Sequence, residues 1–166
     1  MRILLAGSSG LSGRALVASL ENDGIEVRRL IRPETRGLGI PWNPMVGEFP
    51  ADALDGVVAV VNLAGHSIGD KRWSESEKRF LMDSRVVATR VLAEAIGALR
   101  NPPILINASA VGFYGNRNEI PIDEDAVRGD GYLAEICEAW EAATAPAAAA
   151  GSRVVLMRSG IVLSVE

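Results

Sequence analysis

Cysteine, histidine and long apolar runs are all scarce in this chain of 166 residues. The single cysteine, Cys137, excludes an internal disulfide and offers no metal cluster, which suits a reducing compartment. Every apolar stretch is shorter than the roughly 18 residues of a membrane-spanning helix, and the N-terminal run is too short for a signal peptide. We therefore expect a cytoplasmic protein that binds no metal ion and no membrane.

An excess of positive charge is missing as well. Lysine and arginine number 17 against 21 acidic residues, which gives a formal net charge of −4 and an isoelectric point near 5.1. These basic residues are scattered, so no basic face for nucleic acid is predicted. Hydrophobic residues make up 48% of the chain, enough for one globular domain that buries roughly two-thirds of its unfolded surface.

Apolar runs of strand length alternate along the chain with segments of helical periodicity. We expect strands at residues 2–6, 26–31, 57–63, 104–109 and 153–157, a short strand at "IPW", and helices at about 11–23, 75–99 and 131–145. Because the strand segments are mostly continuous apolar runs rather than alternating ones, they are typical of a parallel sheet covered on both faces. The pattern predicts an α/β fold of the Rossmann type, a doubly wound parallel sheet in a three-layer α/β/α arrangement.

The stretch "GSSGLSG" directly follows the first predicted strand. In a dinucleotide-binding turn, the first glycine makes the tight turn, the second admits the pyrophosphate and the third lets the helix pack against the sheet. The next helix directs free N–H groups and its positive dipole end at the phosphates. The sequence therefore predicts a dinucleotide site, with a plain glycine-rich turn as the alternative. Its residues would be Gly7, Ser8, Ser9, Gly10, Leu11 and Gly13.

The tip of the second predicted strand indicates which dinucleotide is bound. An enzyme that prefers NAD usually carries Asp or Glu there, to bind both ribose hydroxyls. This chain carries Arg32, with Arg28, Arg29 and Arg36 nearby, and a guanidinium suits a 2′-phosphate through paired hydrogen bonds. We therefore predict NADP(H) in preference to NAD(H). The alternatives are that Arg32 is a solvated surface residue, or that Glu34 turns toward the ribose.

Several further motifs accompany the glycine turn, namely "VNLAG" (61–65), "RW" (72–73), "SRVVATRVL" (84–92), "ASAVGFYG" (108–115), "CEAWE" (137–141) and "RSGIVLS" (158–164). Together they make the chain resemble the extended short-chain dehydrogenases/reductases, and within these the branch of epimerase family proteins described as nucleoside-diphosphate-sugar epimerases. The resemblance implies that residues 1–166 form an NADP(H)-binding Rossmann domain. Members of the branch continue into a smaller part that forms most of the substrate pocket, which implies that this chain is the cofactor-binding part. An apolar patch left uncovered would favour a homo-oligomer.

The same resemblance implies positions for further cofactor-binding residues. The loop after the third predicted strand would pass beneath the adenosine and ribose, through Leu63, Ala64 and Gly65. Arg85 would approach the cofactor, or else form a surface ion pair with Glu77 or Asp83. His66, the only histidine, lacks companions for a metal site, and proton transfer is its alternative role.

Chemistry in the family uses a serine that holds the substrate oxygen, a tyrosine acid/base, and a lysine four residues later that lowers the tyrosine pKa. Ser109 fits the serine, while Tyr132 and Tyr114 are the candidate tyrosines. Four residues after them stand Ile136 and Asn118, and the only lysines, Lys71 and Lys78, precede both. The Tyr-x-x-x-Lys pair is therefore missing. If the family pattern is instead aligned on Glu141, Leu133 and Cys137 stand at the tyrosine and lysine positions.

Two functions remain open. The first is an oxidoreductase or epimerase that uses NADPH with an altered acid/base on an unknown carbonyl or nucleotide-sugar-like substrate. The second is an NADPH-binding sensor or interaction module without turnover. Packing is the alternative role for Tyr132, and Cys137 is expected to be a buried small hydrophobe. Trp140 and Glu141 are expected to close their helix onto the sheet. The loop 115–131 would cover the nicotinamide end, or form a flexible surface loop.

Overall fold

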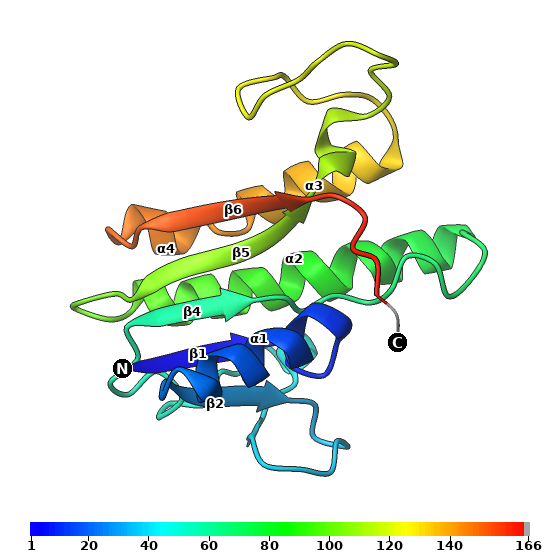
Figure 1. Cartoon of the computed structure of the whole chain (residues 1–166). Helices are drawn as coiled ribbons and strands as arrows, with labels where there is room; N and C mark the ends of the chain where they lie inside the picture. Colours follow the sequence, from blue (N-terminus) through cyan, green and yellow to red (C-terminus); the bar gives the residue numbers. More distant parts are fainter. Residues whose placement is uncertain (165–166) are drawn as a thin grey trace.

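The computed structural model describes residues 1–164, which fold around one six-stranded parallel sheet (Figure 1). The strands are β1 (Arg2–Ala6), β2 (Glu26–Ile31), β3 (Ile40–Pro41), β4 (Ala59–Asn62), β5 (Ile104–Ala110) and β6 (Val154–Ser159). They lie in the order β3-β2-β1-β4-β5-β6, and every neighbouring pair is parallel. This confirms the predicted Rossmann-type fold. The order reverses between β1 and β4, where such sheets open a crevice at the carboxyl ends of the strands.

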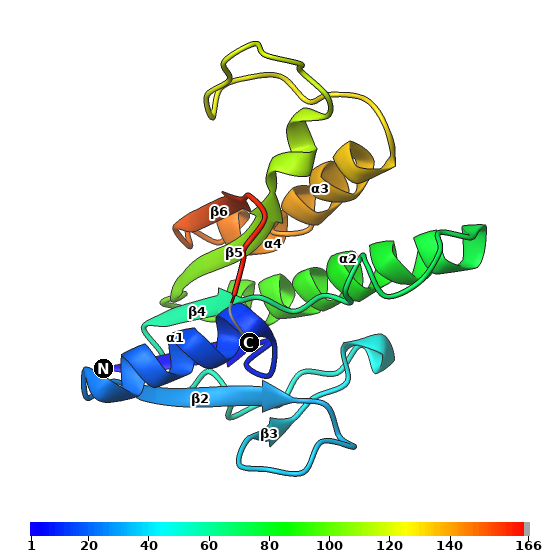
Figure 2. The same cartoon turned by 45° about the vertical axis from the view of Figure 1, so that its right-hand side comes forward.

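Helices cover both faces of the sheet (Figures 1 and 2). One face carries α1 (Leu11–Asn22), and the other carries α2 (Glu75–Gly97), α3 (Tyr132–Ala142) and α4 (Ala145–Ala149). Successive residues of β1 enter different cores, because Leu4 packs in the cluster under α2 and α4 whereas Leu5 packs in the smaller cluster under α1. The three predicted layers are thereby confirmed. Within residues 1–164, none of the helices combines the length and apolarity that crossing a membrane would demand.

One predicted helix is divided in two. The segment expected to be helical at 131–145 ends as α3 at Ala142, and α4 begins separately at Ala145. Pro146 lies in the first turn of α4, where its missing N–H costs nothing, whereas a continuous helix through it would lose a hydrogen bond and meet a ring clash. The short strand expected at "IPW" is observed as β3, followed by a 3₁₀ turn, η1 (Pro44–Val46).

A buried polar network fastens the middle of the sheet to the helices behind it. Asn62 of β4 and Asn107 of β5 lie opposite each other in register, and both are fully buried. The Nδ2 of Asn62 donates to Asn107 Oδ1 at 2.7 Å and to Thr89 Oγ1 of α2 at 2.9 Å. Trp140 of α3 donates its indole N–H to the same Thr89 oxygen at 2.9 Å. The network, which we call the Asn62 network, thus satisfies these buried groups while it joins two strands and two helices.

Candidate functional site

The predicted site residues gather at the carboxyl edge of the sheet. The glycine turn follows β1, Arg32 follows β2, and residues 63–66 follow β4. Ser109 is the second-to-last residue of β5, which leads into a 3₁₀ turn, η2 (Val111–Tyr114). In both views the chain after β6 runs across this edge toward the start of α1 (Figures 1 and 2). The parallel strands thereby bring together segments that lie far apart in the sequence.

Two glycines fix the turn after β1. Gly7 has a φ of +85°, and a Cβ there would lie 2.6 Å from the carbonyl carbon of Leu63. A Cβ on Gly13 would lie 2.2 Å from the carbonyl oxygen of Gly7. The motif predicts that Gly13 lets the helix pack against the sheet. In the structure, the close contact at Gly13 is instead made with the turn itself. Both positions exclude any side chain in this geometry.

Gly10 has a different environment from these two glycines. A Cβ there would make only an ordinary contact, 3.6 Å from the Gly7 oxygen. Gly10 is the N-cap of α1, and no side chain of the described residues caps the helix. Ser9, Gly10 and Leu11 are exposed, and Ser8 is half-buried. The uncapped N–H groups and the positive end of the helix dipole suit an anion, so these residues fit the pyrophosphate of a dinucleotide.

Arg32 stands directly after β2, with 75% of its side chain exposed. Its Nη1 lies 3.9 Å from Glu34 Oε1, an exposed pair of little energetic weight. The neighbouring Arg28 donates to a backbone carbonyl, and Arg29 pairs with Glu21 of α1 at 2.5 Å. Arg32 is therefore better placed than Arg28 or Arg29 to meet a phosphate at this strand end, although Glu34 competes for it.

Arg85 supports the loop after β4 from α2. Its Nη2 donates to the carbonyl of His66 at 2.8 Å, and a Cβ on Gly65 would lie 3.3 Å from its Cζ. Its hydrogen-bond partners among residues 1–164 are backbone carbonyls and a serine hydroxyl, so the ion pairs considered with Glu77 and Asp83 are not formed there. Burial lowers the pKa of Arg85 from its ordinary value. The residue thus holds Gly65 and His66 in place.

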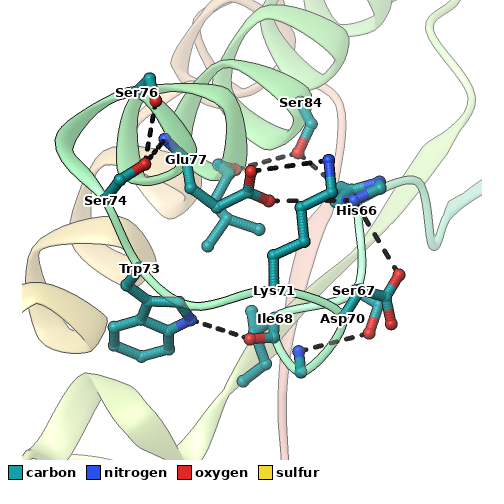
Figure 3. A network of polar contacts seen from close by, with 12 residues as sticks. His66, Ser67, Ile68, Asp70, Lys71, Trp73, Ser74, Ser76, Glu77 and Ser84 are labelled. Atoms are coloured by element: carbon teal, nitrogen blue, oxygen red, sulfur yellow. Dashed lines mark hydrogen bonds and ion pairs between the residues drawn. The ribbon is translucent and has the colours of Figure 1, made fainter.

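His66 begins a loop that returns to the start of α2 (Figure 3). Its backbone N–H donates to Ser84 Oγ at 3.2 Å, and its Nε2 lies 3.9 Å from Asp70 Oδ2 and 4.0 Å from Glu77 Oε1. These separations exceed hydrogen-bond length, and Nε2 has no hydrogen-bond partner in the described part of the chain. Residues 1–164 contain no group of three or more His, Cys, Asp or Glu side chains that could hold a metal ion. Proton transfer by His66 stays a prediction.

Tyr132 begins α3 and contacts both the first turn of α2 and the loop in front of it. Its hydroxyl donates to the backbone carbonyl of Lys78, and its ring packs edge-on against Trp73 with centroids 5.9 Å apart. Burial raises the pKa of Tyr132 above its ordinary value and outweighs the opposing effect of the nearby Lys78 ammonium. An acid/base for neutral pH requires the opposite shift. The contacts with Lys78 and Trp73 fit the packing alternative, and acid/base catalysis by Tyr132 stays a prediction.

Glu141 and Arg158 connect Ser109 with Tyr114 through hydrogen bonds. These contacts were not predicted from the sequence. Ser109 Oγ donates to Glu141 Oε1 at 2.6 Å. Arg158 donates twice to the same carboxylate, from Nε to Oε1 at 2.8 Å and from Nη2 to Oε2 at 2.9 Å. Its Nη1 donates to Tyr114 Oη at 2.9 Å, and its Cζ lies 3.6 Å from the ring centre of Phe113. We call Ser109, Glu141, Arg158 and Tyr114 the Arg158 cluster.

The Arg158 cluster carries two opposite charges that are largely withdrawn from water. Ser109 is 4% exposed and Tyr114 5%, while the side chains of Glu141 and Arg158 are 9% and 19% exposed. Burial raises the pKa of Glu141, but the hydrogen bonds from Arg158 and Ser109 outweigh it and hold that pKa below its ordinary value. The same pairing raises the pKa of Arg158. Glu141 therefore does more than close α3 onto the sheet.

A cavity of about 680 Å³ opens beside the Arg158 cluster. Tyr114 and Arg158 line it together with Val111, Leu156 and residues 122–124 of the loop that follows η2. Its volume lies in the usual range of small-molecule sites. The loop 115–131 thus contributes directly to a concave surface, at the end of β5 and β6.

Cys137 lies in α3 with 3% of its surface exposed. Burial raises the pKa of its thiol, which outweighs the opposing influence of the nearby Ala110 backbone and Ser109 hydroxyl. We expect Ellman's reagent at pH 8 to modify the folded chain at least about tenfold more slowly than the urea-unfolded chain, because the thiol is both protonated and covered. A folded chain that reacts as fast as the unfolded one would contradict the buried, unreactive role of Cys137.

Comparisons with known proteins agree with this geometry. The family model described as "NAD dependent epimerase/dehydratase family" matches residues 3–164. Epimerase family protein ML0860 of Mycobacterium leprae is 47% identical over 165 residues, which cover 99% of this chain and 53% of that protein. The chain thus spans about half the length of the curated relatives that it matches.

Solved structures show the same likeness. The crystal structure of the nucleoside-diphosphate sugar epimerase from Corynebacterium glutamicum matches with a TM-score of 0.86 and 41% identity, over 99% of this chain and 34% of that one. The crystal structure of human epimerase family protein SDR39U1 (isoform2) with NADPH matches with a TM-score of 0.84 and 31% identity, over 100% of this chain and 56% of that one. These matches confirm the predicted resemblance: the chain belongs to the NAD dependent epimerase/dehydratase family.

Proposed function

We propose that the chain binds NADP(H) at the carboxyl edge of its sheet and serves an epimerase/dehydratase-like oxidoreductase. The substrate would be a carbonyl or nucleotide-sugar-like compound. The observation that carries this proposal is the glycine turn, in which Gly7 and Gly13 exclude side chains while the uncapped start of α1 offers N–H groups beside Gly10. The human relative whose structure contains NADPH supports the choice of cofactor.

In this proposal each predicted residue has a separate task. Gly7 and Gly13 shape the turn, while Ser8, Ser9, Gly10 and Leu11 surround the pyrophosphate. Leu63, Ala64 and Gly65 pass beneath the adenosine and ribose, with Arg85 holding that loop from below. Arg32 binds the 2′-phosphate. The nicotinamide supplies reducing equivalents when it is bound.

The second candidate function is an NADPH-binding module without turnover. It is favoured by the missing Tyr-x-x-x-Lys pair and by the hydroxyl of Tyr132, which is committed to the Lys78 carbonyl. Calorimetric titration with NADPH, followed by assays of NADPH consumption with a panel of carbonyl compounds, separates the two. Tight binding with turnover supports the oxidoreductase, whereas tight binding without turnover supports the module.

Replacing Arg32 by aspartate is expected to weaken NADPH binding about 10- to 100-fold, because charge-assisted hydrogen bonds to the 2′-phosphate are lost. NADH, which lacks that phosphate, should lose less than about threefold. Calorimetric titration with both cofactors measures the difference. Arg100→Asp is the matched control, since it makes the same charge change at an exposed residue after α2 and should leave both affinities unchanged. Equal losses for the two cofactors in Arg32→Asp would contradict the 2′-phosphate assignment.

We also propose the cytoplasm as the compartment, supported by the lone, buried Cys137. A small molecule is the proposed partner, because the cavity beside the Arg158 cluster has a suitable volume and the chain has no excess of basic residues. Formation of a homo-oligomer stays a prediction.

A further inference from the structure

The contacts of the Arg158 cluster suit tasks for Ser109 and Tyr114 that differ from those implied by the family resemblance. We propose that the hydroxyl of Tyr114, positioned by Arg158 and Glu141, donates to the oxygen of the substrate, and that Ser109 is a positioning residue that orients Glu141. The inference rests on the proposed function, because it places the substrate of that function in the cavity beside the cluster.

The proton of Ser109 is already committed. Glu141 has a pKa held below its ordinary value, so its carboxylate is ionised at neutral pH and can only accept hydrogen bonds. The 2.6 Å contact between Ser109 Oγ and Glu141 Oε1 therefore uses the one proton of the serine hydroxyl. A serine in this state cannot also donate to a substrate carbonyl. Its remaining task is to hold Glu141.

The proton of Tyr114 is not committed in this way. A guanidinium has donors only, so the 2.9 Å contact with Arg158 Nη1 makes Tyr114 Oη an acceptor. In residues 1–164, no hydrogen bond is found in which this hydroxyl is the donor. The same side chain lines the cavity beside the cluster. An acceptor oxygen of a bound molecule would complete the hydrogen bonding of Tyr114.

Arg158 is rigidly placed for this positioning task. Its fork binds both oxygens of Glu141, its Cζ lies over the ring of Phe113, and its Nη1 also donates to the carbonyl of Glu124 at 3.1 Å. Because the planar guanidinium is held on both its edge and its face, the Arg158 side chain loses little further conformational freedom when a substrate binds. The cation beside the Tyr114 oxygen is therefore Arg158 of β6. In the family pattern this cation is a lysine on the same helix as the tyrosine.

The lining of the cavity narrows the class of substrate. Val111, Ile122 and Leu156 give it an apolar wall, and Asp123 and Glu124 add two acidic residues. The one cation of the lining, Arg158, is already neutralised by Glu141. A diphosphate would meet like charge here, whereas an uncharged carbonyl compound would not. The cavity therefore suits an uncharged molecule with an apolar body and a carbonyl oxygen that accepts from Tyr114.

The test uses the fact that the chain has only two tyrosines. Labelling with [ζ-¹³C]tyrosine gives two NMR signals, and Tyr132→Phe leaves the signal of Tyr114 alone. This labelled chain is titrated with cyclohexanone, and separately with methylenecyclohexane, which has the same shape without the acceptor oxygen. We expect a saturable shift of the Tyr114 signal with the ketone and no such shift with the hydrocarbon. Absence of any ketone-dependent shift, or an equal shift with both probes, overturns the proposal.

Further variants separate positioning from folding. Ser109→Ala should keep most of the ketone-dependent shift, because the serine does not touch the substrate and Arg158 still holds Glu141 through two hydrogen bonds. The double variant E141Q/R158Q removes both charges together, so neither is left buried alone, and it should lose at least half of the shift while remaining folded. Thermal unfolding checks the fold of each variant. Loss of the shift in Ser109→Ala, together with its retention in E141Q/R158Q, would reverse the assigned roles.

Calorimetric titration with NADPH on the same samples separates this inference from the function on which it rests. NADPH binding without the ketone-dependent shift contradicts only the role given to Tyr114. The ketone-dependent shift without NADPH binding contradicts only the proposed function.

Discussion

Replacing Gly13 by alanine is expected to abolish measurable NADPH binding and to lower the free energy of unfolding by about 3 kcal/mol. The new Cβ would lie 2.2 Å from the carbonyl oxygen of Gly7, so either the turn or the start of α1 must move. For a chain of this size the loss corresponds to a fall in melting temperature of about 6–12 °C. Thermal unfolding followed by circular dichroism, and calorimetric titration with NADPH, measure the two effects.

Gly10→Ala is the matched control for this prediction. Its Cβ would make only an ordinary 3.6 Å contact, so we expect a cost of about 1 kcal/mol from the poorer N-cap. Its methyl group would stand where we place the pyrophosphate, and NADPH binding should weaken although the fold is kept. Unchanged stability in Gly13→Ala would contradict the close packing of the turn. Unchanged NADPH affinity in Gly10→Ala would contradict the position of the pyrophosphate.

Replacing Glu141 by leucine is expected to lower the free energy of unfolding by about 3–4 kcal/mol at pH 7. The change leaves the guanidinium of Arg158 and the hydroxyl of Ser109 without their buried partner. Urea unfolding measures the loss. The control is Glu138→Leu, also on α3, because Glu138 pairs with Arg128 at 3.1 Å but is 58% exposed and should contribute less than about 1 kcal/mol. Similar losses in both variants would contradict a special role for the Arg158 cluster.

The stabilisation by Glu141 has a definite pH dependence. Because its pKa is lowered in the folded chain, the stabilisation is fully present above the ordinary pKa of about 4.3 and is lost as the pH falls through the lowered value. The difference in unfolding free energy between the unchanged chain and Glu141→Leu should therefore stay constant from about pH 7 to pH 5 and shrink below about pH 4. Urea unfolding at several pH values measures this difference, and a difference that widens on acidification would contradict the ion pair.

Local sequence features were sufficient to predict most of the fold. The segments expected as strands at 2–6 and 26–31 correspond residue for residue to β1 and β2. In β1 the apolar run is almost continuous, because a strand buried on both faces needs no alternation. The glycine spacing predicted the turn between β1 and α1, since a positive φ at Gly7 and a close approach at Gly13 both demand a missing side chain. Element ends were less predictable, as Pro146 shows by separating α4 from α3.

The Arg158 cluster could not be predicted in the same way. Ser109, Tyr114, Glu141 and Arg158 come from β5, η2, α3 and β6, and their contacts depend on how α3 is rotated against the sheet. Periodicity gives the buried face of a helix but not the partner of one carboxylate on it. The available signal was Arg158 itself, a charged residue near the end of the otherwise apolar run "VVLMRS". A charge that is largely withdrawn from water requires a partner, which the sequence alone does not identify.

The Asn62 network has a consequence for how the molecule opens. Breaking it would leave several amide, hydroxyl and indole groups without partners in the interior, so β4, β5, α2 and α3 should separate only when the whole chain unfolds. Amide hydrogen exchange should accordingly be slowest around Asn62 at the end of β4 and around Asn107 in β5. Local opening of the outer loops would then leave the carboxyl ends of β4 and β5 aligned. A nucleotide bound at these strand ends would therefore stay bound while the loops open and close.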